Sequence, residues 1–523
     1  MDGGDADAAP VERRRWWLLF LLMAVAAGTW SLGVPLMTGH DEASEAIRSA
    51  SAARGNLFGA PQPGSHNALV RLPVPEAYGQ AEWFNYCFLG RPFEWIQGMP
   101  TRPALRRHCP AFEGDHTIVS AQTNQQRNPP AYPIVQGLPT LAFPGQLGAY
   151  LMRLVGAVIC AGLLASGLVT VARFRIPRLA ALAALAVVTP EVLYVAGTSN
   201  TAGLEMAASF ALWAAALALA LGPGAPDRRL VRRAGVALVL LVLARPMSPA
   251  FALIALAVAA YLATPERRRA LWARRDVRRW LIAGGLAAAT TVTWLVVLEI
   301  RRPVPASVGT GLSDAVGLVP WWTRGMVGVF GSTDVIPPAA LHVAWGAVAV
   351  AVLAWSLTRA PARAGLVSAG LIVGGLALLV SGQGFGIPDT GFWWQGRYVV
   401  PLLMGGVLTA AAASRPDRGR PGAPGRSGPW LAGVLAGLQV WGFLYAVRHY
   451  SVGYGGTANP LRYLTDPVWS PPYGPDLLFA ALFAAAVGLT AAVVWRSAAV
   501  APAAAPPPGD EPVPVGGLAG VTG

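Results

Sequence analysis

The sequence has few charged residues and no lysine. Only 13% of its 523 residues are charged, 54% are hydrophobic, and every basic residue is an arginine. Together with a mean hydropathy of +0.47, this composition excludes an ordinary soluble domain and predicts a polytopic membrane protein. The net charge of +14 does not indicate a nucleic-acid partner, because the arginines cluster in short connections between apolar runs, which is a topology signal.

Sequence motifs of several enzyme and pump classes are also absent. The chain contains no P-loop, no GxGxxG and no nucleophile elbow, which argues against an ATP-driven pump and a soluble-type hydrolase. Only three cysteines are present. Cys160 lies in an apolar run and is interpreted as a core residue. Cys87 and Cys109 share one long polar loop, and we predict a disulfide between them if that loop faces an oxidising compartment.

Apolar runs of about 20 residues, each long enough to cross a bilayer, organise the chain. The predicted fold is an all-α polytopic membrane protein with about 11 transmembrane helices, a short broken-helix hairpin and a mixed extracytoplasmic first loop. We divide it into a cytoplasmic N-terminus (1–15), a first transmembrane helix (16–37), an extracytoplasmic loop subdomain (38–144), a transmembrane bundle (145–495) and a disordered cytoplasmic tail (496–523). Spans in the bundle are predicted at 145–172, 177–197, 201–221, 280–299, 339–357, 364–381, 397–413, 430–447 and 477–495.

Two prolines explain one stretch whose charge pattern does not fit a full span. Residues 234–263 lie between two basic connections that should both be cytoplasmic, and Arg245-Pro246-Met247-Ser248-Pro249 is at their centre. Since proline breaks a helix, we predict short helices at 234–245 and 249–263 that enter and leave on the same side. Arg245 would then lie at membrane depth, where an arginine is a candidate for function. One long tilted helix is the alternative.

Three carboxylates follow the first span, where it should emerge on the outer side of the bilayer. Asp41, Glu42 and Glu45 lie close together in the sequence. In a helix the i, i+4 spacing places Asp41 and Glu45 on one face, with Arg48 one turn further along and able to pair with Glu45, while Glu42 points elsewhere. A solvated helix start is the plain alternative, since first turns favour carboxylates.

Other polar residues are predicted to gather on the same outer face. A carboxylate facing an arginine-lined cleft suits sugar transfer from a lipid phosphate, because the acid can take the proton of an acceptor hydroxyl and guanidinium groups can hold the leaving phosphate. We therefore assign Asp41 and Glu42 as catalytic candidates. The candidates for binding the donor phosphate or substrate are Arg397, Arg245, Arg153, Arg324, Gln395, Tyr398 and Asn128.

Some of these candidates have plainer interpretations. The aromatic residues Trp393, Trp394 and Tyr398 could form an interfacial belt, and Arg397 could snorkel from a helix end. Asn128-Pro129-Pro130 is typical of a rigid turn into a helix. The histidines of the first loop lack the spacing of a zinc site. The sequence identifies no cofactor with certainty. A divalent cation is the one alternative, and Asp41 would be its ligand.

The order of several short motifs resembles a known family. His40-Asp41-Glu42 follows the first span, and the later motifs appear in order along the chain. These motifs are Asn128-Pro129-Pro130, Met152-Arg153-Leu154, Thr198-Ser199-Asn200, Arg245-Pro246 and Gln395-Gly396-Arg397-Tyr398. Together they resemble the bacterial membrane proteins known as the domain of unknown function 2142 family, over roughly residues 15 to 495.

That family is similar to the class C (GT-C) glycosyltransferases. The resemblance implies a polyprenyl-phosphate-sugar-dependent enzyme of the cell envelope, with Asp41 as base or metal or acceptor ligand, Glu42 as its partner and Arg397 as a donor-phosphate contact. Ala131-Tyr132 departs from the family pattern, in which a Leu-Tyr or Tyr-Tyr pair is expected. The resemblance also implies a location in the bacterial plasma membrane.

Three functions are compatible with these observations. The first is a glycosyltransferase that takes a sugar from a lipid-linked donor and passes it to an envelope glycan or lipid acceptor on the outer face. The second is a transporter or flippase of lipid-linked glycans, in which Arg153 and Arg245 line a path. The third is a non-catalytic membrane protein of envelope assembly. The absence of a recognisable internal repeat and the gathering of polar groups on one side favour the first.

Overall fold

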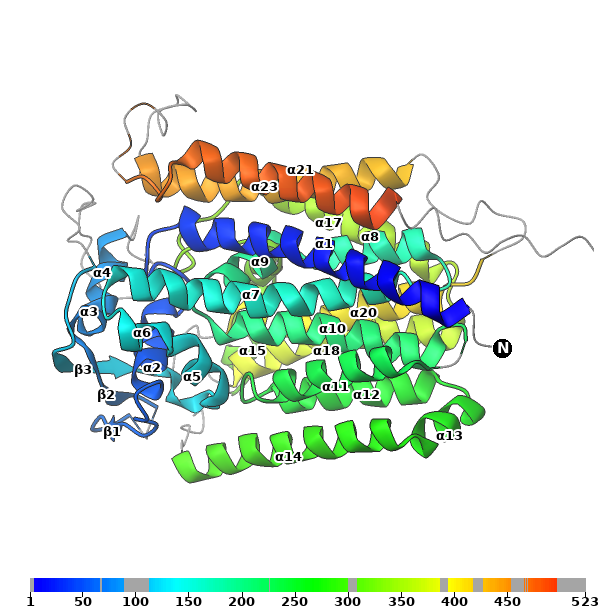
Figure 1. The fold of residues 1–523 in the computed structure, drawn as a ribbon, viewed down its shortest axis with the longest axis horizontal. Coiled ribbons are helices and arrows are strands. Elements are labelled where there is room, and N and C mark those ends of the chain that lie inside the picture. The colour runs from blue at the N-terminus through cyan, green and yellow to red at the C-terminus, as the bar shows by residue number, and fades with distance from the viewer. Residues whose placement is uncertain are drawn as a thin grey trace, which may run out of the picture.

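Long helices run side by side along one direction, and a small subdomain covers one end of them (Figure 1). This computed structural model describes residues 4–65, 68–88, 112–224, 226–299, 308–385, 394–416, 427–452, 465, 467 and 469–495. We call the end that carries the described part of residues 38–144 the subdomain end. The N-terminus and α13 (Pro265–Ala273) lie at the opposite, arginine-rich end (Figure 1).

Within the described residues, nine helices are long and apolar enough to cross a membrane, or ten if one bent pair counts as a span. Each of the ten predicted ranges overlaps one of them, whereas the predicted total of about 11 exceeds the number found. Among them α10 is the central helix, since 94% of its apolar window is buried. The nine are α1 (Gly4–Gly33), α7 (Gln146–Val171), α10 (Thr201–Leu221), α14 (Arg275–Leu298), α17 (Ala339–Leu357), α18 (Ala362–Gly384), η2 with α20 (Gly396–Val399, Val400–Ala413), α21 (Ser427–Val452) and α23 with η3 (Pro475–Thr490, Ala491–Trp495).

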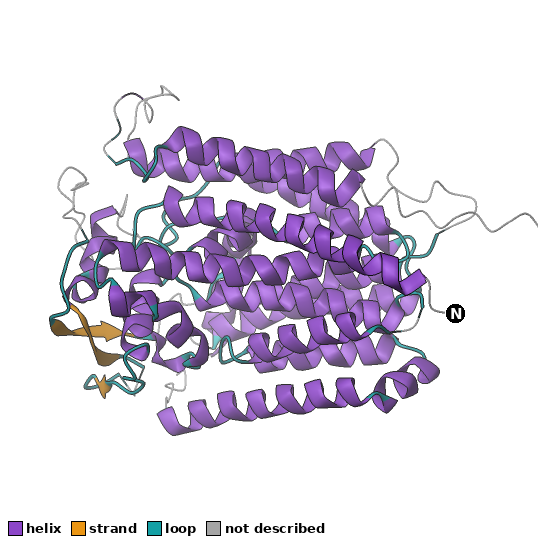
Figure 2. Cartoon of the chain, in the orientation of Figure 1, coloured by secondary structure: helices purple, strands orange, loops and turns teal. Residues whose placement is uncertain are grey.

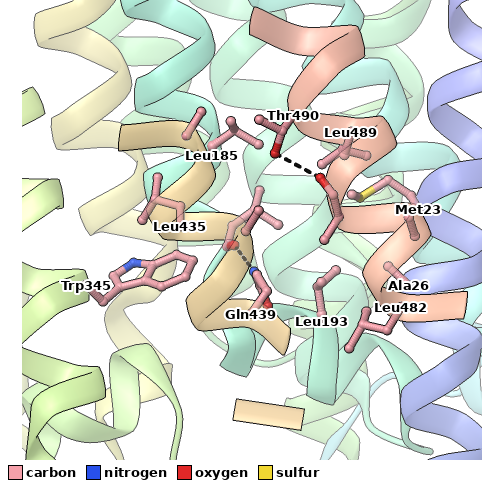
Figure 3. Close-up of a pocket in the computed structure, with 15 residues that line it drawn as sticks. Met23, Ala26, Leu185, Leu193, Trp345, Leu435, Gln439, Leu482, Leu489 and Thr490 are labelled. Atoms are coloured by element: carbon pink, nitrogen blue, oxygen red, sulfur yellow. Dashed lines mark hydrogen bonds between the residues drawn. The ribbon is translucent and has the colours of Figure 1, made fainter. Parts of the chain in front are cut away.

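The bent pair consists of α8 (Pro177–Val187) and α9 (Pro190–Gly197), which meet at 59°. Pro190 has no N–H to donate to the carbonyl of Ala186 four residues earlier, and that carbonyl accepts a bond from Trp345 Nε1 at 2.9 Å instead. The Val188 carbonyl accepts from Gln439 Nε2 at 2.7 Å, beside a small apolar cavity of about 40 Å³ (Figure 3). Neighbouring side chains thus satisfy the backbone that the break exposes, as a membrane interior requires.

The predicted hairpin is confirmed. Helices α11 (Arg228–Val242) and α12 (Ser248–Leu262) have 15 residues each, or about 22 Å, which is too short for a hydrocarbon core of about 30 Å. They pack on each other and on α10, and the five residues between them, 243–247, include Arg245. One long tilted helix is therefore excluded, and the break brings Arg245 beside α10.

The subdomain combines short helices with a small sheet, whose strands are the orange elements of Figure 2. Its three strands pair antiparallel in the order β1-β2-β3, with Val70 opposite Thr123 in the longer pair. Two further helices, α15 (Val308–Gly317) and α16 (Val319–Val327), connect the bundle helices. The elements of the subdomain are α2 (Glu42–Ala52), β1 (Ala60–Pro61), β2 (Val70–Pro75), α3 (Glu76–Gly79), α4 (Ala81–Phe88), β3 (Ile118–Thr123), η1 (Gln125–Arg127), α5 (Ala131–Gly137) and α6 (Pro139–Ala142).

Candidate functional site

Asp41 lies at the N-cap of α2 but does not cap it. Its φ is +53°, in the left-handed region that few non-glycine residues adopt, and its side chain makes no capping hydrogen bond. The carboxylate instead accepts a hydrogen bond from Arg397 Nη2 at 2.8 Å, across 356 residues of sequence. Its side chain is 31% exposed, while that of Arg397 is 2% exposed. The backbone thus holds Asp41 in an uncommon conformation that presents one partly accessible carboxylate to a buried guanidinium.

Arg397 is held in place by the short helix η2. Its Nη1 also donates to Gln395 Oε1, so Asp41 and Gln395 share the guanidinium. Gly396 between them lies against α16, where a Cβ would come within 1.9 Å of the Trp322 carbonyl oxygen. Only glycine permits this close approach. The snorkelling alternative for Arg397 does not fit the structure, because its head group is buried.

Two guanidinium groups lie near the ring of Tyr398. Arg245 lies over its ring at 4.7 Å from the centroid, and Arg397 lies at 5.3 Å. Arg245 also pairs with Glu205 of α10, with Nη1 3.2 Å from Oε2, and Ser248 donates to the other oxygen of that carboxylate at 2.6 Å. We call Asp41, Arg245, Gln395, Arg397 and Tyr398 the arginine–aspartate site. It joins the first loop, the hairpin and η2.

Two N–H groups in this site have no acceptor. Nε of Arg397 and Nε of Arg245 are both buried and lack a hydrogen-bond partner among the residues that the structure describes. A buried donor without an acceptor is costly and calls for an explanation. An anionic oxygen bound beside the two guanidinium groups would supply the acceptors.

The charge around Asp41 is mostly positive. Burial acts to raise the pKa of Asp41, but Arg397, then Arg127, His40 and Arg245, outweigh burial and hold that pKa below its ordinary value. Asp41 is consequently a carboxylate at neutral pH. An added phosphate would offset part of the positive field and raise the pKa of Asp41, making it a stronger base while an anion is bound.

Glu42 points away from this site and forms a closed cluster with Arg153. The two side chains are 1% and 0% exposed, and Arg153 Nε and Nη2 each contact a Glu42 oxygen at 2.6 Å. Gly39 N and Ser199 N donate to the same carboxylate at 2.9 and 3.0 Å. A carboxylate that already accepts four hydrogen bonds has no lone pair left to take a proton from a substrate hydroxyl. The geometry gives Glu42 a structural role in place of the catalytic role expected.

Arg153 closes the end of the first helix. Its remaining N–H groups donate to the carbonyls of Ser31, Val34 and Pro35 at 2.7–2.8 Å, so all five have acceptors. The first helix ends at Gly33, just before Pro35, rather than at residue 37 as predicted. The exposed carbonyls of that end require donors, and Arg153 supplies them. It is therefore a helix-end ligand here, in place of the substrate contact expected.

Glu45 anchors the subdomain to the start of α10. Its Oε1 accepts from Thr201 Oγ1 at 2.7 Å and from Asn128 Nδ2 at 3.0 Å. Burial raises the pKa of Glu45 above its ordinary value, although the Thr201 hydroxyl and Arg245 lower it. The predicted partner Arg48 donates instead to the Leu57 carbonyl at 2.8 Å and lies over Trp294. Asn128, a predicted substrate contact, donates here to Glu45 and Thr201 and so connects the subdomain to α10.

The structure describes only some of the remaining predicted residues. Arg324 is exposed on α16, which packs on η2. Trp393 and Cys109 lie outside the described residues. Cys87 is disulfide-bonded and Cys160 is free. Because Cys109 is outside the described residues, its predicted pairing with Cys87 stays a prediction.

The side chains around Asp41 suit an anion better than a divalent cation. Among the described residues, no three His, Cys, Asp or Glu side chains come together as metal ligands. The neighbours of Asp41 include the guanidinium groups of Arg397, Arg127 and Arg245, which repel a cation. We therefore assign no step to a metal ion.

Sequence reasoning missed Arg127 and Glu205. Arg127 directly precedes the Asn128 turn and contributes to the positive field at Asp41. Glu205 is an acid inside an apolar span and balances Arg245. The signal for Glu205 was present, because an ionisable residue within a membrane helix is by default a functional candidate with a partner.

Comparisons with known proteins give one family and a distant structural likeness. A family model described as predicted membrane protein (DUF2142) matches residues 19–405. No curated protein matches the chain. Similar solved structures include ArnT from Cupriavidus metallidurans bound to undecaprenyl phosphate, at 17% identity and a TM-score of 0.40, and its apo state, at 16% and 0.39. Each alignment covers 92% of this chain and 77% of ArnT.

Proposed function

Since the chain belongs to the DUF2142 family of predicted membrane proteins, we propose that it is an integral membrane glycosyltransferase that takes a sugar from a polyprenyl-phosphate donor. The acceptor is a cell-envelope glycan or lipid on the outer face. The observation that carries this proposal is the contact between Asp41 and Arg397, at 2.8 Å. It places one partly exposed carboxylate beside guanidinium groups that have spare donors.

Each group has a role in the transfer. The Asp41 carboxylate takes the proton of the acceptor hydroxyl while the hydroxyl oxygen bonds to the anomeric carbon of the sugar. The bond between that carbon and the phosphate oxygen breaks, and the polyprenyl phosphate leaves with the electron pair. Arg397 and Arg245 stabilise its negative charge through their guanidinium groups. Tyr398 contacts both guanidinium groups through its ring and helps to orient them.

The distribution of arginine supports an orientation in which the subdomain end faces the outside of the cell. Cytoplasmic connections are enriched in arginine, and α13 with the connection at 226–233 lies at the end opposite the subdomain (Figure 1). The N-terminus would then be cytoplasmic and the arginine–aspartate site would face the outer leaflet, where a lipid-linked donor presents its phosphate. The plasma membrane of a bacterium is the corresponding location.

The state of Arg153 weighs against the transporter alternative. That alternative needs Arg153 to line a path for the substrate, but its five N–H groups are engaged and its side chain is fully buried. By contrast, Arg245 and Arg397, which act on Asp41, each keep one buried Nε–H group without an acceptor among the described residues.

The test compares two site variants with a matched control. Asp41→Asn removes the base and Arg397→Gln removes a phosphate contact, and each should lower the transfer rate by roughly 10²–10⁴-fold. Asp476→Asn makes the same change at an exposed aspartate of α23 and should leave the rate unchanged. The assay uses purified protein in liposomes with candidate polyprenyl-phosphate sugars, alongside the envelope glycan profile of a strain that carries each variant. An unchanged profile and rate for Asp41→Asn would contradict the proposal.

A further inference from the structure

A basic hollow lies at the arginine-rich end, far from the arginine–aspartate site. It has a volume of about 580 Å³ and lies between the starts of α11 and α14. These two helices pack against each other, and Trp280 lies so close to Gly235 that a Cβ there would be 2.0 Å from the indole. The side chains that line the hollow include Arg228, Arg229, Arg232, Asp276, Arg279 and Trp280.

The charge of this hollow suits an anion. Its four arginines are all exposed, so their head groups are accessible to a ligand. The single carboxylate among the lining residues is already neutralised, because Arg274 donates to both oxygens of Asp276 at 3.0 and 2.7 Å. The hollow therefore carries a large net positive charge over a small area, and guanidinium groups bind phosphate oxygens bidentately.

The neighbouring surface is apolar and exposed. Ile282 and Leu286, one and two turns beyond Arg279 on α14, are 63% and 66% exposed, and Val236 of α11 is 39% exposed. In a membrane these side chains face lipid, while Trp280 lies at the level where indole rings prefer the interface. A basic hollow next to a lipid-facing groove matches a molecule with a phosphate at one end and hydrocarbon chains at the other.

We propose that this hollow, defined by Arg228, Arg229, Arg232 and Arg279, binds the headgroup of an anionic phospholipid from the adjacent leaflet. The acyl chains lie along the exposed side chains between α11 and α14. The bound lipid fills the hollow and joins α14, whose apolar window is only 28% buried, to the rest of the bundle. This site is independent of the reaction at Asp41.

The test measures lipid binding to the full-length protein. Protein in mixed phosphatidylcholine and phosphatidylglycerol nanodiscs is extracted, and the retained lipids are counted by native mass spectrometry. The double variant Arg232→Gln/Arg279→Gln should weaken phosphatidylglycerol binding roughly 30-fold, since each arginine near an anionic lipid contributes about fivefold. The control Arg268→Gln/Arg278→Gln removes two exposed arginines of α13 and α14 that do not line the hollow, and it should retain wild-type binding.

Three outcomes would overturn the proposal. The first is equal retention of phosphatidylglycerol and phosphatidylcholine by the wild-type protein. The second is an equal loss in the control variant, which would mean that the charge of the whole arginine-rich end attracts lipid. The third is displacement of the bound lipid by inorganic phosphate alone, which would identify a site for free anions. Retention of phosphatidylglycerol by the wild-type and control proteins, with its loss in the hollow variant, supports it.

Discussion

Glu42→Gln should destabilise the protein strongly, whereas Asp41→Asn should do so much less, although the two acids are adjacent. Glu42 accepts four hydrogen bonds, two of them from a guanidinium that is 0% exposed. The glutamine amide has the shape of the Glu42 carboxylate but no charge, and its NH2 group donates where one carboxylate oxygen accepted. A buried arginine without its partner costs about 3–5 kcal/mol, which is a large part of a total stability of roughly 5–15 kcal/mol.

Asp41 supplies the comparison within the same turn. Its side chain is 31% exposed, and the asparagine keeps an oxygen that can accept from the buried Arg397. Asp41→Asn should therefore cost less than Glu42→Gln, about 1–3 kcal/mol. Asparagine also tolerates the positive φ of this position as well as aspartate does. The variant should fold, with a thermal transition lowered less than that of Glu42→Gln.

The assay is thermal and detergent-induced unfolding of each purified variant, followed by size-exclusion chromatography. The double variant Glu42→Gln/Arg153→Met should lose less stability than the two single variants added together, because it leaves no buried charge without a partner, although the carbonyls at the end of the first helix lose their donor. Wild-type stability of Glu42→Gln would refute the assignment of Glu42 to structure. Strict additivity, in which the double variant loses as much stability as the two single variants together, would refute it as well.

Three further predictions concern the site and its support. Gly396→Ala should displace η2 and lower both the stability and the transfer rate, since its Cβ would meet a backbone oxygen at 1.9 Å. The control Gly370→Ala on α18 has open space around the new Cβ and should keep both. Equal effects of the two variants in thermal unfolding would contradict this prediction. Arg397→Gln removes the largest charge that lowers the pKa of Asp41, so the acid limb of its residual pH–rate profile should move to higher pH, and a shift to lower pH would disprove it. Burial raises the pKa of Glu45, so the folded protein holds the Glu45 proton more tightly than the unfolded chain does and loses stability as the pH rises above the ordinary pKa of a glutamate. Glu45→Gln should remove that loss in unfolding measured from pH 5 to 8, and an unchanged pH dependence would count against it.

The position of the spans and of the hairpin followed from local chemistry. Each apolar run has the length of a bilayer, and the two prolines of the 245–249 stretch predicted the interruption that the structure describes between α11 and α12. The ends were less accurate, because the first helix ends at Gly33 rather than residue 37. Where a helix ends before a proline depends on which distant donor satisfies its last carbonyls, and here that donor is Arg153.

The candidate site could be predicted only in part. The sequence alone brought Asp41 and Arg397 into one hypothesis, through the charge pattern that places both on the outer face. Helical spacing also separated Glu42 from Asp41, as observed. Nothing in the local pattern distinguished a carboxylate that is free for chemistry from one enclosed by four donors, because those donors come from Arg153 and from backbone far along the chain.

Composition, apolar length and arginine placement by themselves determined that this chain is a membrane protein and which of its connections lie on the same side. Tertiary structure decided which acid meets which arginine, since Asp41 and Arg397 are 356 residues apart and touch only after the first loop, the hairpin and η2 have packed together. The physical reason is that burial and pairing set the charge state and accessibility of an ionisable group, and both depend on neighbours that no short stretch of sequence contains.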